Sequence, residues 1–194
     1  MTRFTSGISA LAFLMSMGLA ATEIRAQVGR IGVEASGGYH VLGGDDFDGF
    51  DNAFGFEAIG SYAFPSGLEL GVGAGIASHD VDGSIATSAD VVGIFGEGRY
   101  RFGFPAPTTP HLHPFVAGRL GWSRISLEVS GETDDPAGSG LLLGLGGGVE
   151  YWFTDAVAAV GAGTINWLDI AASDELPDLT GRSVDFRVGL KVRF

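Results

Sequence analysis

The sequence predicts an all-β fold: an eight-stranded antiparallel up-and-down transmembrane β-barrel preceded by a cleavable signal peptide. Three observations lead to this prediction. Apolar residues recur at every second position in segments of about ten residues, which is the period and length of a strand that crosses a bilayer. Aromatic residues gather at both ends of these apolar faces, as they do at the two interfaces of a membrane. The opposite face carries mostly Gly, Ala and Ser, with a few Glu and Arg, which suits a narrow lumen.

The N-terminal segment has the features of a targeting signal. Arg3 precedes an apolar run over residues 8–21, which is too short to span a bilayer as a helix. Cleavage after Ala26 is favoured because the stretch 22–25 is more polar than the run before it, and cleavage after Ala20 is the alternative. The predicted domains are therefore a signal peptide over residues 1–26 and a transmembrane β-barrel over residues 27–194.

The first four strands are expected over about 30–41, 54–64, 68–78 and 91–102. Polar loops rich in Gly and Asp follow the first and third strands, whereas Pro65, Ser66 and Gly67 form a tight turn after the second. Long and short connections thus alternate, as expected for a barrel with one rim of loops and one of turns. The apolar rows expected to face outward are Ile31, Val33, Ala35, Tyr39 and Val41; Phe54, Phe56, Ala58, Tyr62 and Phe64; Leu68, Leu70, Val72, Ala74 and Ile76; and Val92, Ile94, Tyr100 and Phe102.

The last four strands are expected over about 115–129, 141–153, 157–167 and 182–194. A Pro-rich connection over 103–114 precedes the fifth strand, an acidic loop over 130–140 precedes the sixth, and a two-residue turn, Thr154 and Asp155, precedes the seventh. The apolar parity of the fifth strand changes after Arg124, which indicates a β-bulge near residues 123–125 or a strand that outruns the membrane. The seventh strand is small and apolar on both faces, and its outward set is taken as Val157, Ala159, Ile165 and Trp167.

The final strand shows the clearest alternation. Residues 182–194 read R-S-V-D-F-R-V-G-L-K-V-R-F, with the apolar row ending on the last residue. Here the sequence resembles the small eight-stranded outer-membrane β-barrel family of the OmpA/OmpX transmembrane type. The resemblance implies a bacterial outer-membrane location, with long acidic loops outside the cell and both termini in the periplasm. It also implies that periplasmic chaperones and the barrel-assembly machinery receive the chain. The assembly signal that the machinery is expected to read is Phe186, Val188, Leu190, Val192 and Phe194.

The charges on the inward faces nearly balance, with seven basic and six acidic residues. Charges in a desolvated interior are costly unless they pair, so these residues are expected to form ion pairs across the lumen. The predicted lumen charge network is Arg30, Glu34, Glu57, Glu69, Glu97, Arg99, Arg101, Arg119, Glu150, Asp185, Arg187, Lys191 and Arg193.

Composition and motifs argue against several other classes of function. A net charge of −12 disfavours nucleic-acid binding, and the lack of cysteine removes disulfides and thiolate metal sites. No catalytic, cofactor or metal residues are assigned: His40 and His79 fall on strands that are not neighbours, and His111 and His113 are interpreted as solvated loop residues. A solvated acidic rim is preferred to divalent-cation binding, for which the candidate ligands are Asp45, Asp46, Asp48 and Asp51, or Asp80 and Asp82.

The sequence therefore predicts a monomeric barrel surrounded by outer-membrane lipids, with a structural or surface-interaction role. Its lumen is expected to be plugged by Glu/Arg pairs, since eight strands enclose a space that side chains just fill. A narrow passive pore for small solutes is the alternative, and a membrane-embedded lipid-modifying enzyme is a less favoured one.

Overall fold

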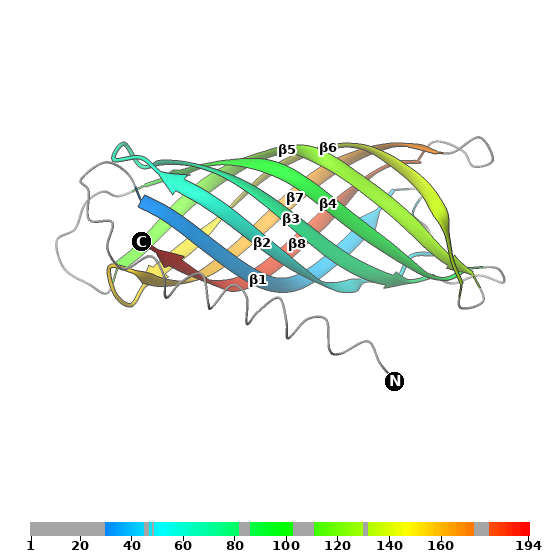
Figure 1. The fold of residues 1–194 in the computed structure, drawn as a ribbon, viewed down its shortest axis with the longest axis horizontal. Coiled ribbons are helices and arrows are strands. Elements are labelled where there is room, and N and C mark those ends of the chain that lie inside the picture. Colours follow the sequence, from blue (N-terminus) through cyan, green and yellow to red (C-terminus); the bar gives the residue numbers. More distant parts are fainter. Residues whose placement is uncertain are drawn as a thin grey trace.

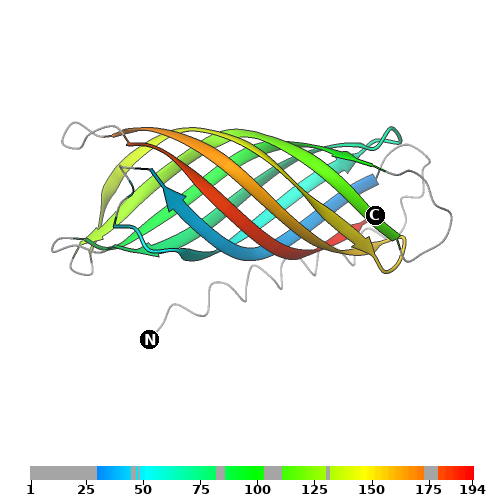
Figure 2. The ribbon, with the colours of Figure 1, turned by 180° about the vertical axis from the view of Figure 1, so that it is seen from behind.

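The computed structural model describes residues 30–44, 47, 49–81, 86–102, 111–129, 132–172 and 179–194. Within these residues the chain forms one closed antiparallel barrel of eight strands, in which each strand pairs with its neighbours in sequence and β1 closes on β8. Figures 1 and 2 show the barrel from two sides, with β1 and β8 lying next to each other. The strands are β1 (Arg30–Gly43), β2 (Ala53–Ala63), β3 (Leu68–Asp80), β4 (Ala86–Arg101), β5 (His111–Val129), β6 (Glu132–Trp152), β7 (Val157–Ala172) and β8 (Leu179–Arg193).

The predicted fold class is confirmed, whereas the predicted signal peptide, residues 1–26, lies outside the described residues. The described residues contain no helix long and apolar enough to cross a membrane. The start of β1 and the C-terminus lie at the same end of the barrel as the turns after β2 and β6 (Figure 1). We call this end the turn rim, and the opposite end, where β1, β3, β5 and β7 finish, the loop rim.

Side chains alternate strictly between the two faces of the barrel wall. Val72 and Val188 are each 72% exposed on the outside, whereas the inward Ile59 and Phe95 are buried. The outward set expected for β7 is confirmed, since Ile165 and Trp167 are exposed while the residues next to them face inward. An uninterrupted apolar outer face is what strands need in order to lie in hydrocarbon, where no water can satisfy a polar group.

Aromatic residues pair along the outer face at both rims. Their rings meet edge to face at centroid distances of 4.9–5.3 Å, a favourable arrangement for two quadrupoles. The outer-face pairs are Phe54 with Phe56, Tyr62 with Phe64, Tyr100 with Phe102, and Tyr151 with Phe153. Together with the exposed Tyr39, Trp122 and Trp167 toward the loop rim, these pairs form the two aromatic girdles that the sequence predicted.

The tight turn after β2 is confirmed, and it depends on a glycine. Gly67 has φ +88°, a left-handed conformation that residues with a Cβ rarely adopt. Its N–H donates to Phe64 O at 3.2 Å, and Phe64 N–H donates to Leu68 O at 2.8 Å. The connection between β6 and β7 is longer than the predicted two-residue turn, because Phe153 N–H donates to Val157 O at 3.0 Å and closes a loop over residues 153–156.

The irregularity predicted near residues 123–125 lies slightly later: the pairing of β5 with β6 shifts register between Ile125 and Ser126. Pairing with β4 runs without interruption through Gly93↔Ser123, Val92↔Arg124 and Val91↔Ile125, and the first register shift on the β6 side comes after Ile125. The parity does not flip through Ile125: Ser123 and Ile125 both point inward and are fully buried. The apolar pattern changes because the lumen itself becomes apolar toward the loop rim.

Two expected loop segments are partly strand. β5 and β6 extend over 19 and 21 residues, so most of the predicted loop 130–140 belongs to a hairpin with pairs such as Val129↔Glu132. The fifth strand likewise begins earlier, at His111 rather than Phe115, which places His111 and His113 in the sheet. His113 is buried, so its interpretation as a solvated loop residue is wrong. Backbone pairing continues past the apolar band and satisfies the N–H and C=O groups there.

The closed ladder should make the folded barrel resistant to SDS. Every strand has two partners, so there is no edge at which unfolding can start. We expect the unheated protein to migrate differently from the boiled protein in SDS gels and to lose its β-sheet circular dichroism only on heating. Identical migration before and after boiling would contradict closure.

Candidate functional site

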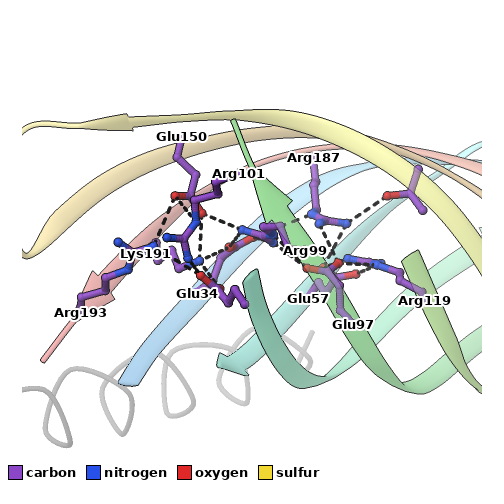
Figure 3. A network of polar contacts seen from close by, with 12 residues as sticks. Glu34, Glu57, Glu97, Arg99, Arg101, Arg119, Glu150, Arg187, Lys191 and Arg193 are labelled. Carbon is purple, nitrogen blue, oxygen red and sulfur yellow. Dashed lines mark hydrogen bonds and ion pairs between the residues drawn. The ribbon is translucent and has the colours of Figure 1, made fainter. Parts of the chain in front are cut away.

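The lumen is filled by charged side chains contributed by seven of the eight strands (Figure 3). Each comes from the inward parity of its strand, and β4 supplies three in succession, Glu97, Arg99 and Arg101. Some pairs are register neighbours, such as Glu97↔Arg119 on β4 and β5. Other pairs join strands on opposite sides of the barrel. The network therefore depends on closure of the barrel as well as on the alternation of residues along each strand.

We call the first group of charges, Glu57, Glu97, Arg119 and Arg187, the mid-lumen cluster. Arg119 donates both Nη atoms to the two Glu57 oxygens at 2.7 Å each, and its Nε to Glu97 Oε2 at 2.7 Å. Arg187 Nη2 donates to the same Glu97 oxygen at 3.3 Å. A two-pronged Arg–carboxylate contact is strong and fixed in geometry, which makes this cluster a rigid cross-brace between β2, β4, β5 and β8.

The second group, the turn-side cluster, comprises Glu69, Glu150, Arg101, Lys191 and Arg193. Lys191 Nζ on β8 donates to Glu150 Oε1 at 2.9 Å and also to Glu69. Arg101 pairs with Glu69 and lies 3.2 Å from Glu150 through its Nε. Arg193 Nη2 donates to Glu69 Oε2 at 3.3 Å. Two carboxylates are thus shared among three cations near the turn rim.

Arg99 joins the two clusters. Its Nη1 donates to Glu34 Oε2 at 2.9 Å and to Glu150 Oε1 at 3.0 Å, and its Nη2 donates to Glu97 Oε1 at 2.7 Å. Figure 3 shows Arg99 and Glu34 between the two groups. The guanidinium is 1% exposed and the three carboxylates are all buried. One residue therefore connects carboxylates from β1, β4 and β6.

Inward aromatic rings cover three of the guanidinium groups. The Cζ atoms of Arg99, Arg119 and Arg193 lie 4.3, 4.2 and 4.0 Å from the ring centroids of Phe115, Phe95 and Trp152. Cations over ring faces are attracted by the ring quadrupole, and the planar groups also pack. These aromatics fill the space between the charges. The sequence analysis gave these three aromatic residues no role.

Not every predicted network residue lies in these clusters. Arg30 is exposed at the turn rim, where its Nη1 donates to Asp155 O at 3.2 Å. Asp185 sits nearer the loop rim and pairs with His40 Nε2 at 3.1 Å. Of the predicted assembly signal, Phe186, Val188 and Leu190 are exposed on the outer face of β8. The chain ends with Phe194 N–H donating to Ile31 O at 2.9 Å.

An apolar cluster lies in the lumen toward the loop rim, and sequence reasoning missed it. We call it the loop-rim apolar cluster: Leu42, Phe47, Ala89, Val91, Ile125, Leu168 and Ile170. Ala89, Ile125 and Ile170 are completely buried, and Phe47 is 2% exposed. The signal in the sequence was the run of apolar residues on inward parity near the ends of β4, β5 and β7.

His40 and His79, which the sequence analysis kept apart, are in contact. His40 Nδ1 lies 2.8 Å from His79 Nε2, and His79 Nδ1 lies 2.7 Å from Asp51 O. With Asp185 on the remaining nitrogen of His40, all four ring nitrogens have partners. In so narrow a barrel, β1 and β3 side chains touch past β2, so strand adjacency was the wrong criterion.

The cation-site candidates lie partly outside the described residues. Asp45, Asp46, Asp48 and Asp82 are not described, whereas Asp51 and Asp80 are joined through a backbone contact, Asp51 N–H to Asp80 O at 2.9 Å. Among the side chains that the structure describes, no group of three or more His, Cys, Asp or Glu is arranged to hold a metal ion.

The fold and the charged lumen together define a small transmembrane β-barrel whose interior is bridged by ion pairs. Residues 9–194 match the profile of the outer membrane protein beta-barrel domain, and the chain belongs to this family. It is thus a bacterial outer-membrane β-barrel protein with transmembrane strands. A comparison with curated proteins found no match.

Solved structures of small barrels share the fold. Neisserial surface protein A (NspA) is 19% identical with a TM-score of 0.68, over 84% of this chain and 97% of that chain. The N-terminal barrel of Pseudomonas aeruginosa OprF is 19% identical with a TM-score of 0.51, over 86% and 99%. Yersinia pestis Ail, the attachment invasion locus protein, is 12% identical with a TM-score of 0.51, over 86% and 97%. At these identities the likeness concerns the fold alone.

Proposed function

We propose that this protein is a non-conducting outer-membrane barrel with a structural or surface-interaction role. The observation that carries the proposal is the lumen network, in which Arg99, Arg119 and Lys191 each bond carboxylates from more than one strand. Such bridges fill the cross-section of the lumen. Opening a path through it would separate buried ion pairs, which costs several kcal/mol for each charge left alone.

The second candidate is a narrow passive pore for small solutes. It is favoured by a cavity of about 90 Å³ inside the lumen and by the many inward glycines. The lining of this cavity, however, includes Glu57, Arg119 and Arg187 of the mid-lumen cluster. The pore therefore requires rearrangement of these residues, whereas the non-conducting barrel requires none.

A lipid-modifying enzyme is disfavoured by the histidine geometry. A serine hydrolase needs one imidazole nitrogen directed at the nucleophilic hydroxyl. Both nitrogens of His40 and both of His79 already have other partners. Neither ring can act as the base for a serine without first breaking one of these contacts.

The proposed placement puts the loop rim outside the cell and both termini in the periplasm, as a monomer among outer-membrane lipids. Because Asp residues dominate the segments after β1 and β3, the external surface is acidic, which leaves weak divalent-cation binding open there. Yersinia pestis Ail has been solved in complex with the heparin analogue sucrose octasulfate. An acidic rim would repel such a polyanion, so we expect a different class of partner here.

Planar-bilayer conductance tests the proposed function. The refolded wild-type barrel is expected to give no steady openings, because its lumen is bridged as described. Detergent buffer alone and boiled protein serve as controls for leakage. Frequent, stable openings from barrels that still shift in SDS gels would overturn the non-conducting assignment and support the pore.

Deletion of Phe194 is expected to affect assembly more than stability. The side chain is only partly buried and can contribute a few kcal/mol at most. We propose that the assembly machinery reads it together with Phe186, Val188, Leu190 and Val192. Outer-membrane yield in cells should fall, while refolding into detergent stays close to wild type. Phe153→Ala, which removes another exposed aromatic side chain, is the matched control. Unchanged cellular yield without Phe194 would contradict the proposal.

A further inference from the structure

Two histidines meet inside the barrel near the loop rim, and the proposed function makes no use of them. His40 on β1 and His79 on β3 have ring centroids 4.9 Å apart, and His40 Nδ1 lies 2.8 Å from His79 Nε2. The two remaining ring nitrogens contact Asp51 O at 2.7 Å and Asp185 Oδ1 at 3.1 Å. His79 is completely buried. We call His40 and His79 the histidine pair.

The partners of the histidine pair determine how many protons it holds. A backbone carbonyl only accepts, so His79 Nδ1 carries a proton and donates it to Asp51 O. Asp185 Oδ2 accepts from Asn166 Nδ2 at 2.6 Å, and its Oδ1 accepts from His40 Nε2 in the same way as an ionised carboxylate. The contact between the two rings needs one proton. Three protons on four nitrogens give the pair a single positive charge.

The surrounding charges compensate one positive charge on the pair but not two. Among the described residues, the charged groups that line the same cavity as His40 are Glu57 on β2, Arg119 on β5, and Asp185 and Arg187 on β8. The carboxylate of Glu57 is already paired with both arginines. The Asp51 and Asp80 side chains are exposed. Asp185 is therefore the counter-ion of the pair, and a second buried charge would be left uncompensated.

The histidine pair attaches the connection between β1 and β2 to β3. Asp51 in this connection is held through both of its backbone groups, because its N–H donates to Asp80 O at 2.9 Å and its carbonyl accepts from His79. The preceding residue, Phe50, forms an isolated β-bridge with Val81. In the same connection Phe47 is buried in the loop-rim apolar cluster. The position of Asp51 against β3 thus depends on the protonation of a buried imidazole.

Adding a proton to the pair has a larger effect than removing one. With four protons, His40 Nδ1 and His79 Nε2 would both carry hydrogen and face each other at 2.8 Å, so the rings must separate. With two protons, the rings still donate to each other and to Asp51 O, and only the donation to Asp185 is lost. Acid therefore breaks the contact with Asp51, whereas base leaves it in place.

We propose that the histidine pair is an acid-sensitive latch, which holds the β1–β2 connection against β3 while singly protonated and releases it when a second proton binds. The latched state binds fewer protons than the released one, so it is favoured as pH rises and lost as pH falls through the range of imidazole titration. In the proposed orientation the latch responds to the pH outside the cell. It does not depend on whether the lumen conducts.

Hydrogen exchange of the Asp51 amide in the refolded barrel, measured by NMR, tests the latch. Its protection factor is expected to fall on the order of tenfold between about pH 8 and about pH 5, as local opening becomes easier. The amide of Phe64, bonded to Leu68 O at the turn rim, is the internal reference and should not change. Constant protection of the Asp51 amide over this range would overturn the proposal.

His79→Gln is the matched variant, because a side-chain amide supplies a donor and an acceptor but takes up no proton in this range. Protection of the Asp51 amide should then be the same at both pH values. His40→Gln, which removes the other ring, replaces it if His79→Gln does not show the folded band in unheated SDS gels. A fall in the variant equal to that in wild type would assign the pH response to other groups and overturn the latch.

Nitrogen-15 NMR of the imidazole rings tests the proton count directly, with the signals assigned through the two glutamine variants. At neutral pH we expect the pair to carry one positive charge in wild type. In Asp185→Asn the pair should be neutral at the same pH, because the amide can donate to His40 Nε2 and no longer compensates a charge. A wild-type pair that is neutral or doubly charged at neutral pH would overturn the proposal.

Discussion

Replacing Arg99 with alanine is expected to lower the free energy of unfolding by about 3–5 kcal/mol, the range for removing one partner of a buried ion pair. The variant leaves Glu34, Glu97 and Glu150 without their common donor while all three carboxylates stay buried in the lumen. Glu34 suffers most, because its remaining ion-pair contacts, with Arg187 and Lys191, are both 3.9 Å long. Repulsion among the freed carboxylates adds to the loss.

Urea titration of the refolded barrel in detergent, followed by tryptophan fluorescence, measures this effect. Arg30→Ala is the matched control, because Arg30 is exposed and donates only to the Asp155 carbonyl in the described contacts; a change of about 0–1 kcal/mol is expected there. The free energy of unfolding of Arg99→Lys should fall between the two, because a single ammonium cannot reproduce the planar set of donors of a guanidinium group. Equal stability of Arg99→Ala and Arg30→Ala would show that the network does not hold the barrel together.

Placing arginine at Val188 should destabilise the barrel by about 2–4 kcal/mol in a bilayer, as for other cations near the midplane of the lipid face. Val188 is 72% exposed at the middle of the outer face of β8. Ile31→Arg, at the turn rim and 58% exposed, is the matched control, with about 0–1 kcal/mol expected near the interface.

Refolding into phospholipid vesicles, with urea titration, gives both values. The two variants differ in membrane depth but not in burial, because both side chains are exposed on the outer face of the barrel. A difference in stability between them therefore reports depth in the bilayer. An exposed valine on a water-facing surface would tolerate arginine with almost no change. A Val188→Arg barrel as stable as wild type would therefore place this face outside the hydrocarbon region.

The sequence could predict the barrel because its main determinant is local. Alternation along one strand, as in β8, specifies which side chains face outward irrespective of what the other strands do. The inward charges followed from the same parity. Which of them pair could not be deduced, because Arg99 meets Glu34 and Glu150 across the lumen, and that depends on strand tilt, register and rotamers.

Each failure has a physical cause. Ile125 was interpreted as a change of face because an apolar side chain has the same appearance in a sequence whether it meets lipid or a dry lumen. The contact between His40 and His79 was missed because residues on non-adjacent strands meet only in three dimensions. The extended pairing of β5 and β6 was missed because residues beyond the apolar band carry acids, proline and glycine that also suit a loop.

The cross-lumen pairing also bears on how the barrel enters the membrane. Lys191 on β8 reaches Glu69 on β3, and Arg99 on β4 reaches Glu34 on β1, so strands from both ends of the chain must be present before these charges find partners. A sheet that inserted with only some strands in place would expose unpaired cations and carboxylates to lipid. Partially inserted intermediates are therefore penalised, and insertion and closure are driven to occur as one cooperative event.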